Sequence, residues 1–128
     1  QTPAKARYLK LVNIQMPTGK FALSGFRVFG KGSGDKPGFV QNFVPLRSGP
    51  KVEGERRNVW YKWQQEPSAD GYVIYFGKSP DKLYGSIMVY GKNEYYFNGL
   101  DRSDVYYFQI EAFNNNGIGP RSEIKKSE

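Results

Sequence analysis

Residues 100–122 read LDRSDVYYFQIEAFNNNGIGPRS, and the spacing of the apolar residues in this stretch decides the fold. Tyr106, Phe108, Ile110 and Ala112 occur at every second position, which predicts a β-strand with one buried face. The strand is followed by Asn-Asn-Asn-Gly and then by Gly-Pro, which are residue types that form turns. A last short strand is predicted over residues 121–125.

Upstream of this strand, further short strands occur at regular intervals and are separated by turn residues. Together they predict an all-β fold, a seven-stranded immunoglobulin-like sandwich of two sheets. Their apolar positions are Phe39 to Val44 before Pro45, then Val59, Tyr61 and Trp63, then Tyr72, Ile74 and Phe76, then Leu83 to Tyr90, then Tyr95 and Phe97.

The combined spacing of these residues is similar to the signature of fibronectin type III domains. Leu100 and Tyr106 are six residues apart, which resembles the tyrosine corner, where the Tyr hydroxyl bonds to the backbone of the preceding crossover. The resemblance places such a domain at residues 39–128, and it departs from the family at Arg102, where a Pro is frequent. The residues that carry the signature are Trp63, Tyr72, Leu100, Tyr106, Ala112 and Gly117.

Residues 1–30 predict a separate two-stranded, hairpin-like appendage. Residues 7–13 are rich in strand-forming types, a Met-Pro-Thr-Gly turn follows, and apolar residues recur from Phe21 to Val28. Residues 31–38 are rich in Gly, Pro and Ser and predict a flexible linker. A lone hairpin is marginal in water, so we expect the appendage to pack on the sandwich; a homodimer through this segment is the second alternative. The apolar side chains to be covered are Leu9, Leu11, Phe21, Leu23, Phe26 and Val28.

Residues 4–30 also resemble the closing strands of a discoidin-like, galactose-binding-like domain. Such a tail before a fibronectin type III domain is similar to the C-terminal end of secreted bacterial glycoside hydrolases of family 43, a family that includes xylosidases. The resemblance implies a neighbouring domain of the same polypeptide and a secreted, periplasmic or bacterial cell-surface location. Sugar binding is not carried over, because the binding loops of a discoidin-like domain would lie upstream.

The composition excludes several classes of function. The chain has neither Cys nor His, which excludes thiol chemistry, disulfides, the usual zinc sites and imidazole catalysis. The net charge is +7, but residues 1–36 hold seven basic residues against one acidic residue, and the remainder is nearly neutral. We therefore interpret the basic excess as a solvated or partner-facing segment and not as a nucleic-acid groove. No membrane span is predicted, because no apolar run is long enough.

The carboxylates predict turns and not catalysis. Asp70, Asp81, Asp101 and Asp104 each neighbour Gly, Pro or Ser, where Asp accepts hydrogen bonds from backbone amides. Asp101 and Asp104 alone fall short of the six to eight oxygens that calcium requires. The sequence therefore predicts no catalytic residue, no metal site and no cofactor, and the isolated chain is not expected to be an enzyme.

Five aromatic residues have the wrong parity for the core and are candidate interface residues. Trp60 and Tyr96 are expected to face outward on one sheet, and Tyr75, Tyr107 and Phe113 on the other. Each one alone is explained by cross-strand packing against long basic side chains. Several on one face predict a docking surface.

These patterns favour a non-catalytic accessory module, a spacer and docking domain of a secreted bacterial carbohydrate-active enzyme. A carbohydrate-binding module that uses its exposed aromatics, with polysaccharide as the partner, is the first alternative. A cell-surface adhesion or receptor fragment is the second. A row of aromatics open to solvent would favour sugar binding, and aromatics covered by a neighbouring unit would favour docking.

Overall fold

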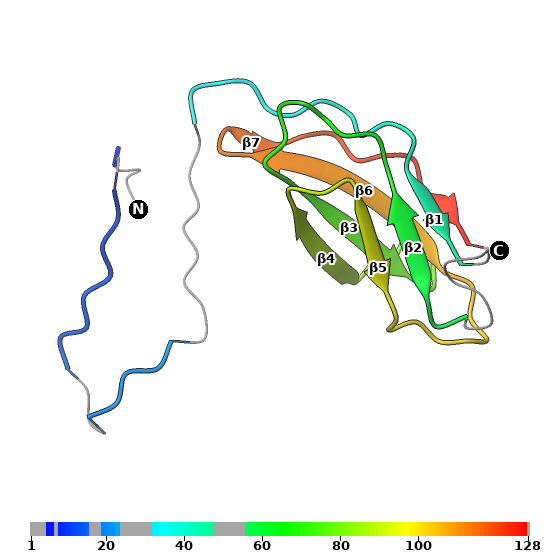
Figure 1. The fold of residues 1–128 in the computed structure, drawn as a ribbon, viewed down its shortest axis with the longest axis horizontal. Coiled ribbons are helices and arrows are strands. Elements are labelled where there is room, and N and C mark those ends of the chain that lie inside the picture. The colour runs from blue at the N-terminus through cyan, green and yellow to red at the C-terminus, as the bar shows by residue number, and fades with distance from the viewer. Residues whose placement is uncertain (1–4, 7, 16–18, 24–31, 48–55, 128) are drawn as a thin grey trace.

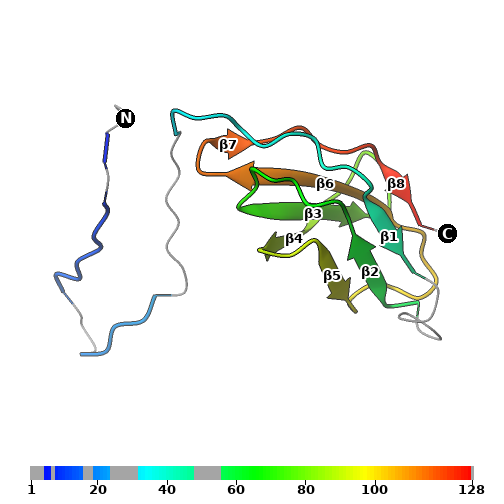
Figure 2. The ribbon, with the colours of Figure 1, turned by 45° about the horizontal axis from the view of Figure 1, so that its top comes forward.

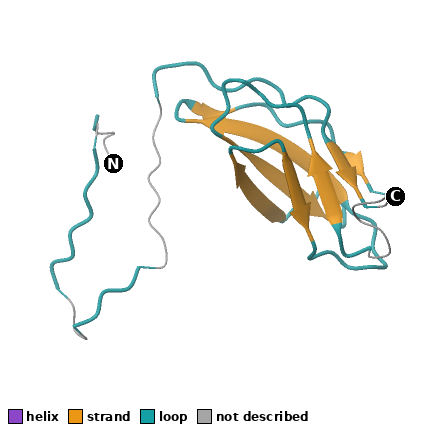
Figure 3. Ribbon diagram, viewed as in Figure 1, coloured by secondary structure: helices purple, strands orange, loops and turns teal. Residues whose placement is uncertain are grey.

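The computed structural model describes residues 5–6, 8–15, 19–23, 32–47 and 56–127, and within these residues it contains strands and no helix (Figures 1 and 3). The predicted all-β class is therefore confirmed. The strands are β1 (Val44–Leu46), β2 (Val59–Lys62), β3 (Gly71–Gly77), β4 (Gly85–Tyr90), β5 (Glu94–Phe97), β6 (Tyr107–Asn114), β7 (Gly117–Ile118) and β8 (Lys125–Lys126).

The strands form two antiparallel sheets that face each other, as two views show (Figures 1 and 2). One sheet has the order β1-β2-β5, and the other has the order β4-β3-β6-β7, with β8 also paired to β6. The register places Tyr72 opposite Ala112 and Ile74 opposite Ile110. Because inward residues lie opposite inward residues, each sheet presents one continuous apolar face to the other.

Aromatic rings fill the space between the sheets. Tyr61 of β2 meets Phe108 of β6 edge to face, with ring centroids 5.5 Å apart. Trp63 meets Tyr72 in the same manner at 5.1 Å. The predicted alternation of β2, β3 and β6 agrees with this core, since the side chains of Tyr61, Ile74, Phe108 and Ile110 are fully buried.

The crossover between β5 and β6 has the corner arrangement that the Leu100–Tyr106 spacing predicts. Both side chains are buried. The Tyr106 hydroxyl accepts a hydrogen bond from the Asp101 amide at 3.1 Å. The same end of the sandwich is closed by Ser127, whose amide donates to the Tyr106 carbonyl at 2.7 Å and whose hydroxyl accepts from the Tyr106 amide at 2.9 Å.

Two predicted strand boundaries are wrong. The first strand was expected from Phe39 to Val44 and ended by Pro45, but β1 begins only at Val44 and contains Pro45, opposite Tyr61. Proline is tolerated there because β1 is an edge strand. The last strand was expected over residues 121–125, but β7 lies before this range and β8 begins only at its last residue. Residues between them still bond to β6, as when the Ser122 amide donates to the Ile110 carbonyl at 2.8 Å.

The N-terminal segment differs most from its prediction. Within residues 5–6, 8–15 and 19–23 the structure has no strand, since an isolated strand pair lacks the partners that stabilise a sheet. These residues lie apart from the sandwich (Figure 1), so packing on the sandwich is also wrong for them. Phe26 and Val28 lie outside the described residues. The exposed fractions are 60% for Leu9, 51% for Leu11, 57% for Phe21 and 51% for Leu23.

Replacing Tyr106 by Phe tests the corner. The change removes the acceptor of the Asp101 amide, and leaving this part-buried donor without a partner should lower the free energy of unfolding by about 1 kcal/mol in urea titrations. Tyr107→Phe is the matched control, because Tyr107 is half-buried on the outer face and its loss should stay within about 0.5 kcal/mol. Equal effects from the two variants would contradict the role of the corner.

Candidate interaction surfaces

The outer face of the β1-β2-β5 sheet carries a cross-strand aromatic pair. Trp60 of β2 lies directly opposite Tyr96 of β5, as their predicted placement on one sheet requires. The Lys62 ammonium lies 4.5 Å from the centre of the Trp60 ring, so this ring is in contact with a cation. Tyr96 is 47% exposed. The pair borders a hollow of about 450 Å³ lined by Trp60, Lys92, Glu94, Tyr95 and Tyr96.

The outer face of the five-stranded sheet holds a hydrogen-bonded network around Tyr75. Its hydroxyl donates to Glu111 Oε1 at 2.7 Å, and Arg121 Nε donates to Glu111 Oε2 at 2.9 Å. The Arg121 guanidinium lies 4.2 Å from the centre of the Tyr75 ring. Burial, followed by the bond to Glu111, raises the pKa of Tyr75. Tyr75 is therefore covered by its own neighbours and is not an open docking residue.

Phe113 is similarly engaged by its neighbours. It lies opposite Gly71 of β3, and its ring meets Tyr90 of β4 edge to face at 5.3 Å. A Cβ on Gly71 would lie 2.6 Å from the Phe113 ring, so the absence of a side chain there makes room for the aromatic pair. Tyr107, the third residue predicted on this face, is half-buried at the start of β6.

The exposed apolar residues next to Phe113 were missed at the sequence level. Met88 is 53% exposed, Tyr90 61% and Ile118 56%. The alternation of side chains in β4 could have predicted two of these residues. Val89 is buried, and its neighbours in the strand must therefore face outward. These further exposed apolar residues therefore lie on β4 and β7, at the two sides of Phe113.

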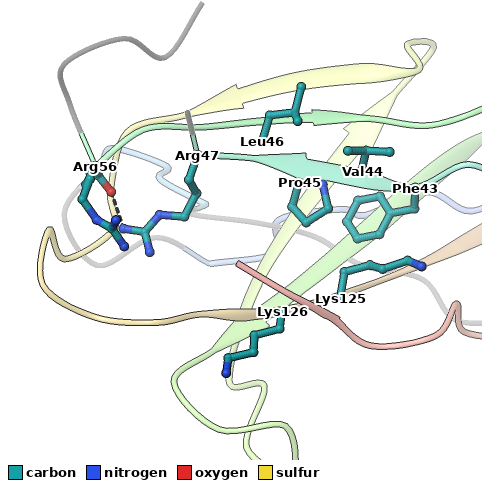
Figure 4. A pocket seen from close by; sticks show the side chains of 8 residues that line it. All are labelled: Phe43, Val44, Pro45, Leu46, Arg47, Arg56, Lys125 and Lys126. Carbon is teal, nitrogen blue, oxygen red and sulfur yellow. Dashed lines mark hydrogen bonds between the residues drawn. The ribbon is translucent and has the colours of Figure 1, made fainter. Parts of the chain in front are cut away.

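A cavity of about 630 Å³ lies between β1 and β8 and is bordered by basic side chains (Figure 4). Arg47 is only 7% exposed, and its guanidinium donates to backbone carbonyls of Asp104 at 2.6 Å and Asp101 at 2.8 Å, and also to that of Arg56. Burial, followed by the neighbouring Arg56 charge, lowers the pKa of Arg47. The lining is completed by Phe43, Val44, Pro45, Leu46, Lys125 and Lys126.

Arg47 was not singled out in the sequence, because an Arg before Ser-Gly-Pro has the pattern of an ordinary surface charge. In the structure it has a structural role. Its guanidinium lies 5.2 Å from the centre of the Tyr106 ring, and its two terminal nitrogens donate to main-chain carbonyls of the two loops at this end. The cation therefore links these loops through hydrogen bonds.

The predicted bond from a backbone amide is present at Asp70, whereas Asp81, Asp101 and Asp104 bond to side chains. Asp70 Oδ2 accepts from the Asn115 amide at 3.1 Å, and Asp81 accepts from the Ser79 hydroxyl. Asp101 and Asp104 both pair with Lys78, the first at 2.9 Å, and these bonds raise the pKa of Lys78. No group of three metal-ligating side chains, and no helix able to span a membrane, occurs in the described part of the chain.

Comparison with solved structures identifies the fold. No family model and no curated protein matches the chain. The FN1–FN3 domains of chicken CNTN1 superpose with a TM-score of 0.60 at 20% identity, over 73% of this chain and 32% of that one, so this chain spans about a third of that structure. The FN5 domain of Drosophila Lar gives 0.56 at 21% identity, over 71% and 94%.

A Fn3-like protein from Clostridium thermocellum gives a TM-score of 0.54 at 18% identity, over 73% of this chain and 91% of that one. At these identities the likeness concerns the fold. The chain therefore has the fibronectin type III sandwich, as the spacing of its apolar residues predicts. Domains with this fold are generally non-catalytic, and they often stand beside other domains in longer proteins.

Removing the Arg121 side chain tests the network on the five-stranded sheet. In Arg121→Ala the Glu111 carboxylate, whose side chain is 6% exposed, loses its cation, and the free energy of unfolding should fall by about 1–3 kcal/mol. Lys125→Ala is the control, because Lys125 is 3.8 Å from an exposed Glu123 carboxylate and such pairs contribute about 0–1 kcal/mol. Equal losses in urea titrations would show that Glu111 does not depend on Arg121.

Proposed function

We propose that this chain is a non-catalytic accessory module, a spacer and docking domain that stands beside a neighbouring domain of the same polypeptide. The parent protein of this proposal is a secreted bacterial carbohydrate-active enzyme, located outside the cell, in the periplasm or on the cell surface. This parent rests on the resemblance of residues 4–30 and 39–126 to the C-terminal end of family 43 glycoside hydrolases. Catalysis would belong to another part of that protein.

The observation that carries the docking role is the contrast between the sandwich and the N-terminal segment. The sandwich has one continuous core, in which Tyr61, Ile74 and Phe108 are fully buried. The N-terminal segment, in contrast, leaves Leu9, Leu11, Phe21 and Leu23 at least half exposed. Each such side chain gains about 1.5–3 kcal/mol when it is fully buried. A segment with this much uncovered apolar surface is suited to a folded partner outside the sandwich.

A domain of the same polypeptide fits this partner best. The segment precedes the sandwich in the chain, so a covalently attached neighbour is present at high effective concentration. Its strand-forming composition favours completion of a β-sheet that begins upstream, which is the place it takes in a discoidin-like domain. A second copy of the chain is the alternative cover, and it depends on protein concentration, whereas an attached domain does not.

Protection of residues 5–23 from a protease distinguishes an attached domain from a second copy of the chain as the partner of this segment. In the isolated chain at low concentration, trypsin should cleave after Lys10 and Lys20, which are exposed in the structure. In the intact parent polypeptide the same bonds should be cleaved at least about tenfold more slowly, because the segment is then part of a folded domain. Cleavage within the sandwich serves as the control and should be slow in both.

Equal cleavage in both proteins would contradict the docking role. Protection that appears in the isolated chain as its concentration rises would support the homodimer instead. Turnover of xylan or aryl glycosides by the isolated chain, abolished by replacing one Asp or Glu, would contradict the non-catalytic assignment.

A second candidate function is carbohydrate binding at the β2–β5 hollow. The observation that favours it is the Trp60–Tyr96 pair beside Lys92 and Glu94. Aromatic rings stack on the apolar faces of sugar rings, and an ammonium and a carboxylate can bond to hydroxyl groups. The contact between Lys62 and Trp60 makes Tyr96 the more accessible ring for such a ligand.

Replacing Tyr96 by Ala tests this second function. The variant should weaken binding of xylan oligosaccharides at least about tenfold in calorimetric titrations, since an exposed aromatic is the main source of contact area in such a site. Tyr84→Ala is the control, because Tyr84 is 85% exposed but lies outside this hollow. The absence of binding by the unaltered chain, or equal effects of the two substitutions, would reject the carbohydrate site.

A further inference from the structure

The segment predicted as a flexible linker lies bound to the end of the β6–β7 hairpin. The Gly32 amide donates to the Asn115 carbonyl oxygen at 3.0 Å. Two residues later, the Gly34 amide donates to Asn116 Oδ1 at 3.1 Å. These bonds join segments that are some eighty residues apart in the chain. The two donating amides are two residues apart, as they are at one edge of a strand pair, although one of the two acceptors is a side chain.

The asparagine run bonds back to the same segment. The side-chain amides of Asn114 and Asn116 each donate to the Asp35 carbonyl oxygen at 3.0 Å. The run is itself held in place, because Asn114 Nδ2 also donates to the Ser68 carbonyl at 3.1 Å and Asn114 Oδ1 accepts from the Asn116 amide at 2.8 Å. Hydrogen bonds therefore run in both directions between the hairpin end and the chain that precedes the sandwich.

The glycines of this segment are required by its fit and not only by flexibility. A Cβ on Gly32 would lie 2.0 Å from Asn116 Oδ1 and 2.9 Å from the Asn115 carbonyl oxygen. A Cβ on Gly34 would lie 2.7 Å from Asn116 Nδ2. At Gly32 an added Cβ would meet the Asn115 backbone, and at both positions the Asn116 side chain would have to shift to make room for it.

The contact continues toward the sandwich through Lys36 and Pro37. The methylene stem of Lys36 lies against Gly117, where a Cβ would be 2.9 Å from Lys36 Cε. Pro37 is buried, and its carbonyl oxygen would lie 2.6 Å from a Cβ on Gly119. The segment is therefore continuous with the packed part of the molecule from residue 32 onward.

We propose that residues 32–37 form a fixed joint, in which the Asn114–Asn116 turn binds the incoming chain and sets the point from which the upstream polypeptide departs. With this joint, the upstream polypeptide departs from the molecule at residue 32, beside the end of the five-stranded sheet, and not at the start of the sandwich. The joint removes residues 32–37 from the free tether, which shortens the maximal reach of an attached domain by about 20 Å.

This inference deepens the proposed accessory role and rests on it only for the nature of what lies upstream. A spacer with a fixed joint holds its neighbour at a limited distance, and a short tether raises the effective concentration of the neighbour at this end of the sandwich. The contact itself is a property of the isolated chain. An experiment can therefore reject this contact without rejecting the docking role, or reject the docking role without rejecting the contact.

Amide exchange and backbone relaxation of the isolated full chain test the joint. The Gly32 and Gly34 amides should exchange at least about tenfold more slowly than unstructured amides. Heteronuclear NOE values for residues 32–37 should equal those of β6, because a bound segment does not move on the nanosecond timescale. In Gly32→Ala the added Cβ should abolish the protection of Gly34 and lower these NOE values, with the β6 amides unchanged.

Ser33→Ala is the matched control, because it changes an exposed position of the same segment and should leave the protection intact. Asn116→Ala gives a second route, since it removes the acceptor of the Gly34 amide from the other side of the contact. Low NOE values and unprotected Gly32 and Gly34 amides in the unaltered chain would overturn the joint. Unchanged Gly34 protection in both Gly32→Ala and Asn116→Ala would also overturn it.

Discussion

The buried Arg47 guanidinium and the Tyr106 ring beneath it are the contact on which the rest of the sandwich depends. Arg47 belongs to the loop after an edge strand of the smaller sheet, and Tyr106 immediately precedes β6 of the larger sheet. The guanidinium donates hydrogen bonds to the Asp101 and Asp104 carbonyl oxygens in the part-buried crossover. Burial lowers the pKa of Arg47, but an Arg stays protonated in proteins, so the hydrogen bonds persist. The two sheets are thereby closed at one end by polar bonds and along their length by aromatic rings.

The parts of the fold that were predictable are those encoded by neighbours in the sequence. Alternation in β6 places Phe108 and Ile110 in the core, because a strand turns every second side chain to one face. The spacing of Leu100 and Tyr106 locates the crossover, and the two outward aromatic sets follow from parity alone. Parity does not say how far an outward side chain is covered. Tyr75 has Arg121 over its ring, and this partner comes from the distant C-terminal segment.

The features that were missed depend on contacts between distant residues. The glycines at 32 and 34 have the pattern of a flexible linker, and only the presence of Asn116 next to them shows that they allow close approach. Pro45 ends a strand by local rules, but an edge strand accepts it. The N-terminal appendage was predicted from propensity and apolar pattern, yet its described residues form no strand, because β-propensity needs cross-strand partners to act.

The account therefore separates the chain into a sandwich that is complete by itself, with its joint, and an upstream segment suited to another unit. The most direct test compares urea unfolding of the full chain with that of a chain that begins at Gly32. Equal free energies within about 0.5 kcal/mol and equal slopes are expected, since residues 5–6, 8–15 and 19–23 are exposed. A loss of more than about 1 kcal/mol together with a smaller slope would contradict it, because the segment would then contribute to the folded core.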